Sequence, residues 1–219
     1  MHPYSSPGSR WRKVGYLMLF AVLFTWFYQA SLVGLFEKLP LLSEDTLPPG
    51  LPTLSIFTLT YIIWDRYLWR FPVIRKFTSM PDLNGEWYGG LQSSYEQTTM
   101  GDFQADGGTE KHGPKMTIDQ TWTSIQVTIE FKNSVSSSQT ASIMHDMTTP
   151  VLRLTYQNRP TGDSQESMTI HEGTNDLHLR QQGDERFLEG KYYTDEHRNN
   201  HGQVRFKQDE RSLGQQILD

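Results

Sequence analysis

The sequence predicts a membrane-anchored all-β protein, in which a two-helix transmembrane hairpin precedes a compact antiparallel β-barrel of about eight strands. Two observations lead to this prediction. Before residue 80 the chain contains two apolar stretches of helix length, separated by a short loop. The rest of the 219 residues consists of short alternating segments and turns, with no further apolar run long enough to cross a bilayer. The mean hydropathy of −0.57 conceals this division.

Charge divides the chain in the same way. Residues 1–78 carry eight Lys/Arg and four Asp/Glu, a net charge of +4; the chain totals of 20 and 25 leave 12 basic and 21 acidic residues afterwards, a net charge of −9. Phosphate neutralisation dominates the binding of long nucleic acids, so we expect no DNA or RNA polymer as partner. The absence of cysteine excludes disulfides, a thiolate nucleophile and cysteine-ligated zinc.

The first predicted transmembrane helix covers residues 14–36, a run of 23 residues without a charge. A bilayer core requires about 20 helical residues, so this run is long enough to span it with some tilt. A cleaved signal peptide is the alternative. It is disfavoured because its apolar core would be about 7–15 residues long and would end at a small-x-small site. Gln29-Ala30-Ser31 is a poor site of that kind.

The second predicted transmembrane helix covers residues 51–70, and its prolines fall in the preceding loop and the first turn, where a missing N–H is tolerated. Its short apolar core leaves a re-entrant or interfacial segment as the alternative. Basic residues flank the outer ends of both stretches, so the positive-inside rule predicts that both termini are cytoplasmic. The predicted organisation is an N-terminal tail (1–13), helix 1 (14–36), an extracytoplasmic loop (37–50), helix 2 (51–70), a linker (71–81), a cytoplasmic β-barrel ligand-binding domain (82–208) and a C-terminal tail (209–219).

The barrel prediction rests on apolar residues that recur at every second position between short turn signals, as in half-buried antiparallel strands. A closed up-and-down barrel removes exposed edges, and eight strands leave room for one small ligand. A β-sandwich is the alternative. The predicted strands are 83–93, 115–121, 124–131, 136–147, 151–157, 166–172, 177–181 and 187–194, with 201–207 completing or closing the set.

The tripeptide Gly85-Glu86-Trp87 stands at the head of the first of these strands. Lipocalin-type barrels often begin in this way, with the tryptophan closing one end, so the barrel is predicted to be lipocalin-like. We expect Trp87 to be a core residue rather than a ligand contact.

Catalytic motifs are missing from the sequence. It contains no P-loop, G-x-G-x-x-G, G-x-S-x-G or H-E-x-x-H pattern. His197 and His201 are four residues apart, but Asn199-Asn200 between them indicates a turn rather than a helix face, which disfavours a metal site. We therefore expect neither an enzyme nor a cofactor or metal centre.

Several aromatic, amide and cationic residues follow the ends of predicted strands. Stacking rings, together with arginine and amide donors, provide the chemistry that binds nucleobases and phosphates. Each aromatic taken alone is more often a core or rim residue, but one barrel mouth could collect the whole set. The candidate ligand-binding residues are Gln120, Trp122, Tyr156, Asn158, Arg159, His171, Tyr192 and Arg198.

With these motifs in order, the chain resembles the two-transmembrane β-barrel effectors of bacterial CBASS (cyclic-oligonucleotide-based antiphage signalling) systems. The resemblance runs over nearly the whole chain, and the order of its short motifs makes it fairly specific. The motifs that carry it are the two apolar stretches and the segments 82–94, 118–122, 156–160, 171–174 and 188–194.

The resemblance implies a function in antiphage defence. A partner nucleotidyltransferase would make a cyclic di- or oligonucleotide, which the barrel would bind. The effector would then self-associate in the bacterial inner membrane, disrupt the lipid bilayer and kill the infected cell. One departure is that Asp195-Glu196-His197 stands where the family leads us to expect glycine and basic residues, which leaves Arg198 as the candidate cation.

Two other functions compete with this one. A constitutive membrane-anchored, lipocalin-like module could bind a lipid or other small apolar ligand. Such a carrier would have an apolar cup, whereas a nucleotide receptor would have a polar and aromatic mouth. A hydrolase on a barrel scaffold ranks last, because the sequence offers no recognisable nucleophile or metal set.

Overall fold

The computed structural model describes two compact units, one formed by Met1–Pro7 with Ser79–Asp219 and the other by Gly8–Thr78. The described residues are 1–5, 14–15, 18–19, 22–23, 26, 51–78, 80–94, 99–100, 113–146, 149–162, 169–196 and 199–209.

The smaller unit contains α2 (Leu51–Arg66), the short 3-10 helix η2 (Leu68–Arg70) and α3 (Pro72–Thr78). Proline is tolerated in the first turn of a helix, which explains why α2 begins at Leu51 despite Pro52 and why α3 begins at Pro72. The Thr58 hydroxyl donates to the Leu54 carbonyl at 2.8 Å, the local bond that a threonine in an apolar helix forms with its own backbone.

The predicted transmembrane hairpin is not supported. Among the described residues, no helix combines the length and the apolar character needed to cross a membrane. α2 has 16 residues, or about 24 Å of helix, against a hydrocarbon core of about 30 Å, and its last two residues are the charged Asp65 and Arg66. This finding contradicts the predicted fold class and the predicted two-span location in the inner membrane. Most of residues 14–36, and all of 37–50, lie outside the described residues.

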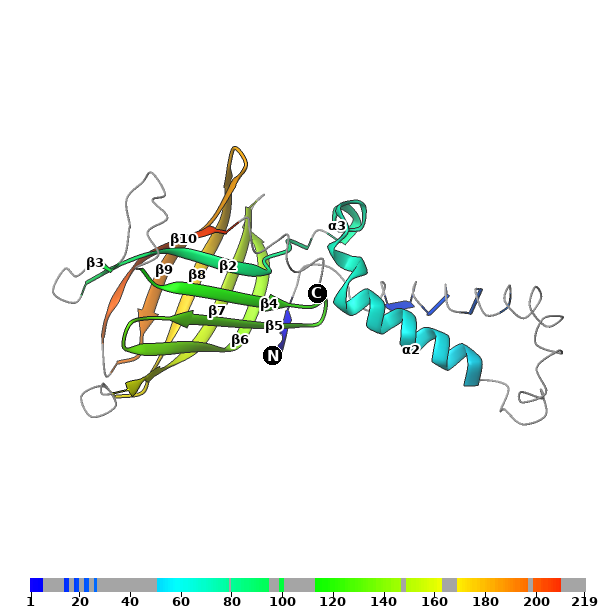
Figure 1. The fold of residues 1–219 in the computed structure, drawn as a ribbon, viewed down its shortest axis with the longest axis horizontal. Coiled ribbons are helices and arrows are strands. Elements are labelled where there is room, and N and C mark those ends of the chain that lie inside the picture. The colour runs from blue at the N-terminus through cyan, green and yellow to red at the C-terminus, as the bar shows by residue number, and fades with distance from the viewer. Residues whose placement is uncertain are drawn as a thin grey trace. The chain divides into compact units, whose positions relative to one another are not determined.

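The larger unit is one almost entirely antiparallel sheet that closes on itself (Figure 1). Its order is β10-β9-β8-β7-β6-β1-β5-β4-β2-β3, and β10 also pairs with β2 from Gly202↔Ser93 to Gln208↔Trp87. Of the ten strands in the described residues, all but the short β1 and β3 form the ring, which leaves eight. The strands are β1 (His2–Ser5), β2 (Gly85–Ser93), β3 (Thr99–Met100), β4 (Lys115–Gln120), β5 (Ser124–Glu130), β6 (Ser134–Asp146), β7 (Thr149–Pro160), β8 (His171–Gln182), β9 (Glu185–Thr194) and β10 (His201–Gln208).

Alternation along each strand sends one set of side chains into the ring. Trp87 is fully buried, and its indole N–H donates to the Leu83 carbonyl at 3.0 Å, so it is a core residue as predicted. Fully burying an apolar side chain of this kind contributes about 1.5–3 kcal/mol. The other large, fully buried side chains of this unit include Trp122, Phe206, Leu83, Met116, Ile118, Ile125, Ile143, Leu152, Leu154 and Leu177.

Two strand assignments differ from the sequence prediction. The end of the predicted strand 166–172 and the predicted strand 177–181 belong to the single strand β8, because Asn175-Asp176 is not a turn. Residues 166–168 lie outside the described residues. Asn175 is 2% exposed and lies opposite Leu154 on β7 and Tyr192 on β9. The pair Asn175-Asp176 is therefore of a residue type typical of turns, but it lies within a strand and Asn175 is buried inside the ring.

The chain's first residues lie in the sheet rather than in a free tail. β6 has a bulge between Ser138 and Thr140, and its pairing with β5 is confined to the Thr128–Glu130 end of that strand. Beyond this point β1 fills the space between the two strands. It runs antiparallel to β5 (His2↔Ile125) and parallel to β6 (Tyr4↔Ala141). The other residues of the predicted tail, 6–13, lie outside the described residues.

Candidate functional site

The inward face of the ring is polar at one end and apolar at the other. The polar end lies where β2, β7 and β9 finish and where β6, β8 and β10 begin. We use "polar end" for seven of its inward residues, all of them buried: Ser93, Ser134, Ser136, Tyr156, Asn158, His171 and Tyr192. At the opposite end the inward residues include Trp87, Ile118, Ile125 and Leu152. Burying this many polar groups is costly unless each finds a partner, so the polar end is the first place to look for a ligand.

Strand register assembles the polar end from separate parts of the chain. Asn158 on β7 lies between Ser136 on β6 and His171 on β8. One inward position further along β7, Tyr156 lies opposite Gly173. These residues are distant in the sequence, and the antiparallel pairing of β6, β7 and β8 brings them together.

Asn158 is the best-defined polar group in this cluster. Its amide nitrogen donates to the hydroxyls of Ser134 at 3.1 Å and Ser136 at 2.8 Å. The side chain is 4% exposed, and no described residue donates a hydrogen bond to its Oδ1 oxygen. The carboxamide is therefore hydrogen-bonded at its nitrogen, while its buried oxygen has no donor among the described residues.

Two glycines set the positions of the tyrosine rings. A Cβ atom on Gly173 would lie 2.4 Å from the Cζ and hydroxyl oxygen of Tyr156, and one on Gly202 would lie 2.6 Å from Cε1 of Tyr192. Such distances are far shorter than van der Waals contact, so only glycine leaves room for these rings. The rings of Tyr156 and Tyr192 thus pack directly on the backbone of β8 and β10.

The structure brings four of the eight sequence-predicted residues together at the polar end: Tyr156, Asn158, His171 and Tyr192. It places Gln120, Trp122 and Arg159 elsewhere. Arg159 is exposed on the outer face, where its Nε donates to Gln157 Oε1 at 2.8 Å. Arg198 lies outside the described residues.

Gln120 and Trp122 lie at the opposite end, next to the β4–β5 turn. The Gln120 oxygen accepts from the Leu83 N–H at 2.9 Å, and its nitrogen donates to the Tyr4 hydroxyl at 3.0 Å and the Pro81 carbonyl at 3.2 Å. Both Gln120 and Trp122 are 1% exposed. The Gln120 amide thus joins β1, β4 and the segment before β2, which is a structural role.

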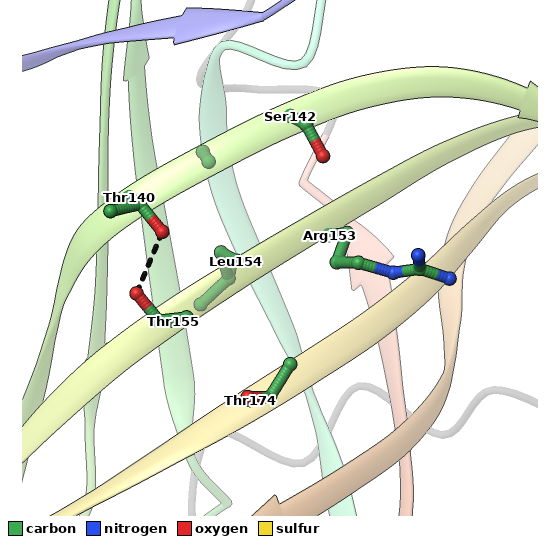
Figure 2. Close-up of a pocket in the computed structure, with 7 residues that line it drawn as sticks. Thr140, Ser142, Arg153, Leu154, Thr155 and Thr174 are labelled. Carbon is green, nitrogen blue, oxygen red and sulfur yellow. Dashed lines mark hydrogen bonds between the residues drawn. The ribbon is translucent and has the colours of Figure 1, made fainter.

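A surface hollow of about 190 Å³ lies on the outer face of β6, β7 and β8, and Figure 2 shows its lining. Thr140 and Thr155 share a hydrogen bond of 2.7 Å between their hydroxyl oxygens. The guanidinium of Arg153 is bonded to Asp176 Oδ2 through Nε at 3.2 Å and Nη2 at 2.5 Å. The main polar groups of the hollow are thus occupied by one another or by Asp176, and the polar end is the stronger candidate for a ligand site.

Comparison with known proteins gives a match over the same part of the chain. The family model described as "Cap15, cyclic dinucleotide receptor domain" matches residues 78–208. The chain belongs to the Cap15 family. The predicted membership of a CBASS effector family is thereby confirmed, and the polar end lies inside the matched receptor domain.

Two curated relatives in the Cap15 family have the same name, "CD-NTase-associated protein 15". The protein from Yersinia aleksiciae is 30% identical over 150 residues, which cover 68% of this chain and 65% of the relative. The protein from Staphylococcus schleiferi is 25% identical over 142 residues, which cover 65% of this chain and 70% of the relative. The chain thus spans a little under two thirds of the length of the first of these relatives.

Sequence reasoning missed the serines of the polar end. Ser134 and Ser136 are 6% and 3% exposed and both accept from Asn158, and Ser93 is 8% exposed. A signal is present, since Ser134-Val135-Ser136-Ser137-Ser138 places serine at every second position of a strand. It is a weak signal because serine is usually a surface residue.

Among the described residues, a cluster of charged groups lies on the outer face of the domain, and none of the seven residues of the polar end is Asp, Glu, Lys or Arg. Lys115 Nζ lies 2.6 Å from Glu86 Oε1, and the Tyr88 hydroxyl donates to Glu86 Oε2 at 2.6 Å. The hydrogen bond from Lys115, and then that from Tyr88, lowers the pKa of Glu86, while the same carboxylate raises the pKa of Lys115 and of Tyr88. Among the described residues, no cluster of three or more His, Asp or Glu could hold a metal ion.

Proposed function

We propose that this chain is the receptor and effector of a CBASS antiphage system, and that a cyclic di- or oligonucleotide binds at the polar end of its closed sheet. The observation that carries the proposal is the gathering of Tyr156, Asn158, His171 and Tyr192 at one end of the domain that matches the cyclic dinucleotide receptor model. We propose a receptor without a catalytic step.

The chemistry of the polar end suits a nucleotide. Tyrosine rings offer faces on which bases stack, and hydroxyls and a carboxamide offer hydrogen bonds to base and sugar. A ring of eight strands has room for one small ligand. Phosphates need cationic partners, and Arg198 is retained as the proposed phosphate contact.

The apolar half of the ring favours a nucleotide receptor over an apolar-ligand carrier. Its inward positions are occupied by the chain's own large side chains, and Trp87, Ile118 and Phe206 are each no more than 1% exposed. An empty apolar cup would instead leave such side chains accessible to a ligand. The carrier is therefore the less favoured function.

The proposed output is self-association, followed by membrane damage and death of the infected cell. A partner nucleotidyltransferase would supply the nucleotide. Binding can drive self-association only if the associated state binds the nucleotide more tightly than the resting state does. Co-expression with an active or inactive nucleotidyltransferase would test this step, because only the active enzyme should make the chain toxic.

Thermal melting of the purified full-length chain tests the binding step. The ligands would be cyclic dinucleotides that cover the combinations of the four RNA bases, together with cyclic trinucleotides. A ligand that binds the native state raises Tm. At a ligand concentration of 100 Kd it adds about 2.7 kcal/mol to the free energy of unfolding. We expect a selective rise with one or a few members. A well-folded chain whose Tm responds to none of them would overturn the proposed ligand class.

A further inference from the structure

The Oδ1 oxygen of Asn158, which has no donor among the described residues, indicates a specific form of ligand recognition. This residue is 4% exposed, and its Oδ1 oxygen is among the buried polar atoms that no described residue satisfies. A buried carbonyl oxygen without a donor carries a free-energy cost. A ligand donor that reaches this oxygen would recover that cost.

The two serines make Asn158 an acceptor toward any ligand. A carboxamide nitrogen has two hydrogens, and the bonds to Ser134 at 3.1 Å and Ser136 at 2.8 Å use both of them. The usual paired contact of asparagine with adenine, one donor and one acceptor, is therefore closed to it. What remains is a single oxygen that selects for an N–H or O–H group.

Burial indicates which part of a cyclic nucleotide supplies this donor. A phosphate diester has no proton to donate at neutral pH, and its charge is expensive to bury without a cation. None of the seven described residues of the polar end is Lys or Arg. The phosphates are thus better placed toward solvent, and a neutral base is the part that fits deepest in the ring.

On these grounds, and resting on the function proposed above, we propose that Asn158 is a base-recognition residue. Its Oδ1 oxygen accepts a hydrogen bond from an N–H group on the Watson–Crick edge of one base of the cyclic nucleotide. Ser134 and Ser136 are positioning residues that hold the carboxamide in this orientation. Tyr156, fixed on Gly173 at the next inward position of β7, lies beside the base so held.

Protein variants provide the first arm of the test. Kd values are measured by calorimetry for the full-length chain, using the cyclic dinucleotide that binds wild type best and two that bind less well. Asn158→Leu removes the acceptor at nearly constant volume, and we expect binding of the best nucleotide to weaken at least about tenfold. The preference over the other two should also collapse, which a merely structural role would not cause.

Gln157→Leu is the matched control, because it makes the same chemical change one residue away. Gln157 faces outward, where its oxygen accepts from Arg159. We expect Gln157→Leu to leave unchanged both the Kd for the best nucleotide and the preference among the three nucleotides. Asn158→Asp retains an acceptor oxygen, so it should keep the order of preference while binding all anionic nucleotides more weakly through added charge repulsion.

Nucleotide analogues provide the second arm and use the unaltered protein, so they decide the question even if Asn158→Leu does not fold. An analogue of the best nucleotide with a methyl group on the Watson–Crick N–H should bind at least about tenfold more weakly. A 2′-deoxy analogue should bind as well as the parent. The opposite pattern would show that the oxygen serves a ribose hydroxyl and would overturn the base assignment.

The outcomes separate this inference from the proposed function. If wild type binds a cyclic dinucleotide while Asn158→Leu keeps its Kd and preference, the role of Asn158 is wrong and the receptor function stands. If wild type binds no member of the panel, the receptor function is wrong and the role of Asn158 falls with it.

Discussion

Gly173 lies beneath the Tyr156 ring at the polar end, where a side chain of any size meets two obstacles. A Cβ atom at this position would lie 2.4 Å from Cζ of the ring and 2.5 Å from the Tyr193 carbonyl oxygen. The first obstacle is a side chain of the candidate site, and the second is the backbone of β9. The position of the Tyr156 ring therefore depends on the absence of a side chain at Gly173 on the neighbouring strand β8.

Gly173→Ala is expected to displace the Tyr156 ring and to weaken both folding and ligand binding. Overpacking of this kind typically costs about 1–3 kcal/mol. Thermal melting would give the loss of stability, and calorimetry would give the loss of affinity. Thr174→Ala, a change of the neighbouring residue, is the control. Unchanged ligand affinity in a folded Gly173→Ala chain would contradict the placement of Tyr156 in the site.

The Glu86–Lys115 pair predicts a pH dependence of stability. The pKa of Glu86 is lowered in the folded chain, chiefly by Lys115, so its contribution is present above the ordinary value of 4.5 and is lost as pH falls through the folded pKa. The pair is partly exposed, which limits its contribution to about 1 kcal/mol or less. Melting of Glu86→Gln and wild type should therefore differ at pH 7 and converge in acid. A difference that persists at the lowest pH would contradict this account.

Residue types alone predicted part of the candidate site. Tyr156, Asn158, His171 and Tyr192 are polar or aromatic residues near predicted strand ends, and the structure places them together. Gln120 and Trp122 satisfied the same criterion but lie at the other end. The pairing of strands that are distant in the sequence decides at which end of the ring a residue lies. Amino-acid composition carries no information about that pairing.

At the scale of elements, β1 is the least expected feature. Four residues are too few for a periodic pattern, and the sequence gives no sign that β5 and β6 separate beyond the bulge at Ser138/Thr140. The Ser138 hydroxyl accepts from the Val127 N–H at 2.9 Å and lies 2.8 Å from His2 Nε2. The bulge therefore creates the space that β1 fills and provides one of its attachments.

Tyr4→Phe tests the attachment of β1. The Tyr4 hydroxyl donates to the Thr121 carbonyl at 3.2 Å and accepts from Gln120 Nε2 at 3.0 Å. Removing the hydroxyl should lower the free energy of unfolding by about 1–2 kcal/mol, because the Thr121 carbonyl and the Gln120 amide each lose a hydrogen bond. Denaturant melts would measure the loss, with the exposed Ser5→Ala as control. An unchanged midpoint would indicate that β1 does not contribute to the stability of the sheet.

At the scale of the whole domain, ligand binding depends on closure of the ring. The polar end takes residues from β2, β6, β7, β8 and β9, and the ring is completed by the pairing of β10 with β2. Closure in one ring also distinguishes the fold from the predicted alternative of a two-sheet sandwich. A site shared in this way can form only when strands from both ends of the domain sequence are paired.

Gly89→Val tests that dependence. A Cβ atom on Gly89 would lie 1.8 Å from the Arg205 carbonyl oxygen across the β2–β10 pair, and because this atom is backbone, the strands themselves must separate. We expect a loss of several kcal/mol of stability, at or above the usual range of about 1–3 kcal/mol for overpacking, and loss of the ligand-induced rise in Tm. Gln203→Val, an outward change on β10, is the control. If Gly89→Val kept the full ligand-induced rise, the site could not depend on the closing strand pair, and the ligand contacts would have to be assigned to β6, β7, β8 and β9 without β2.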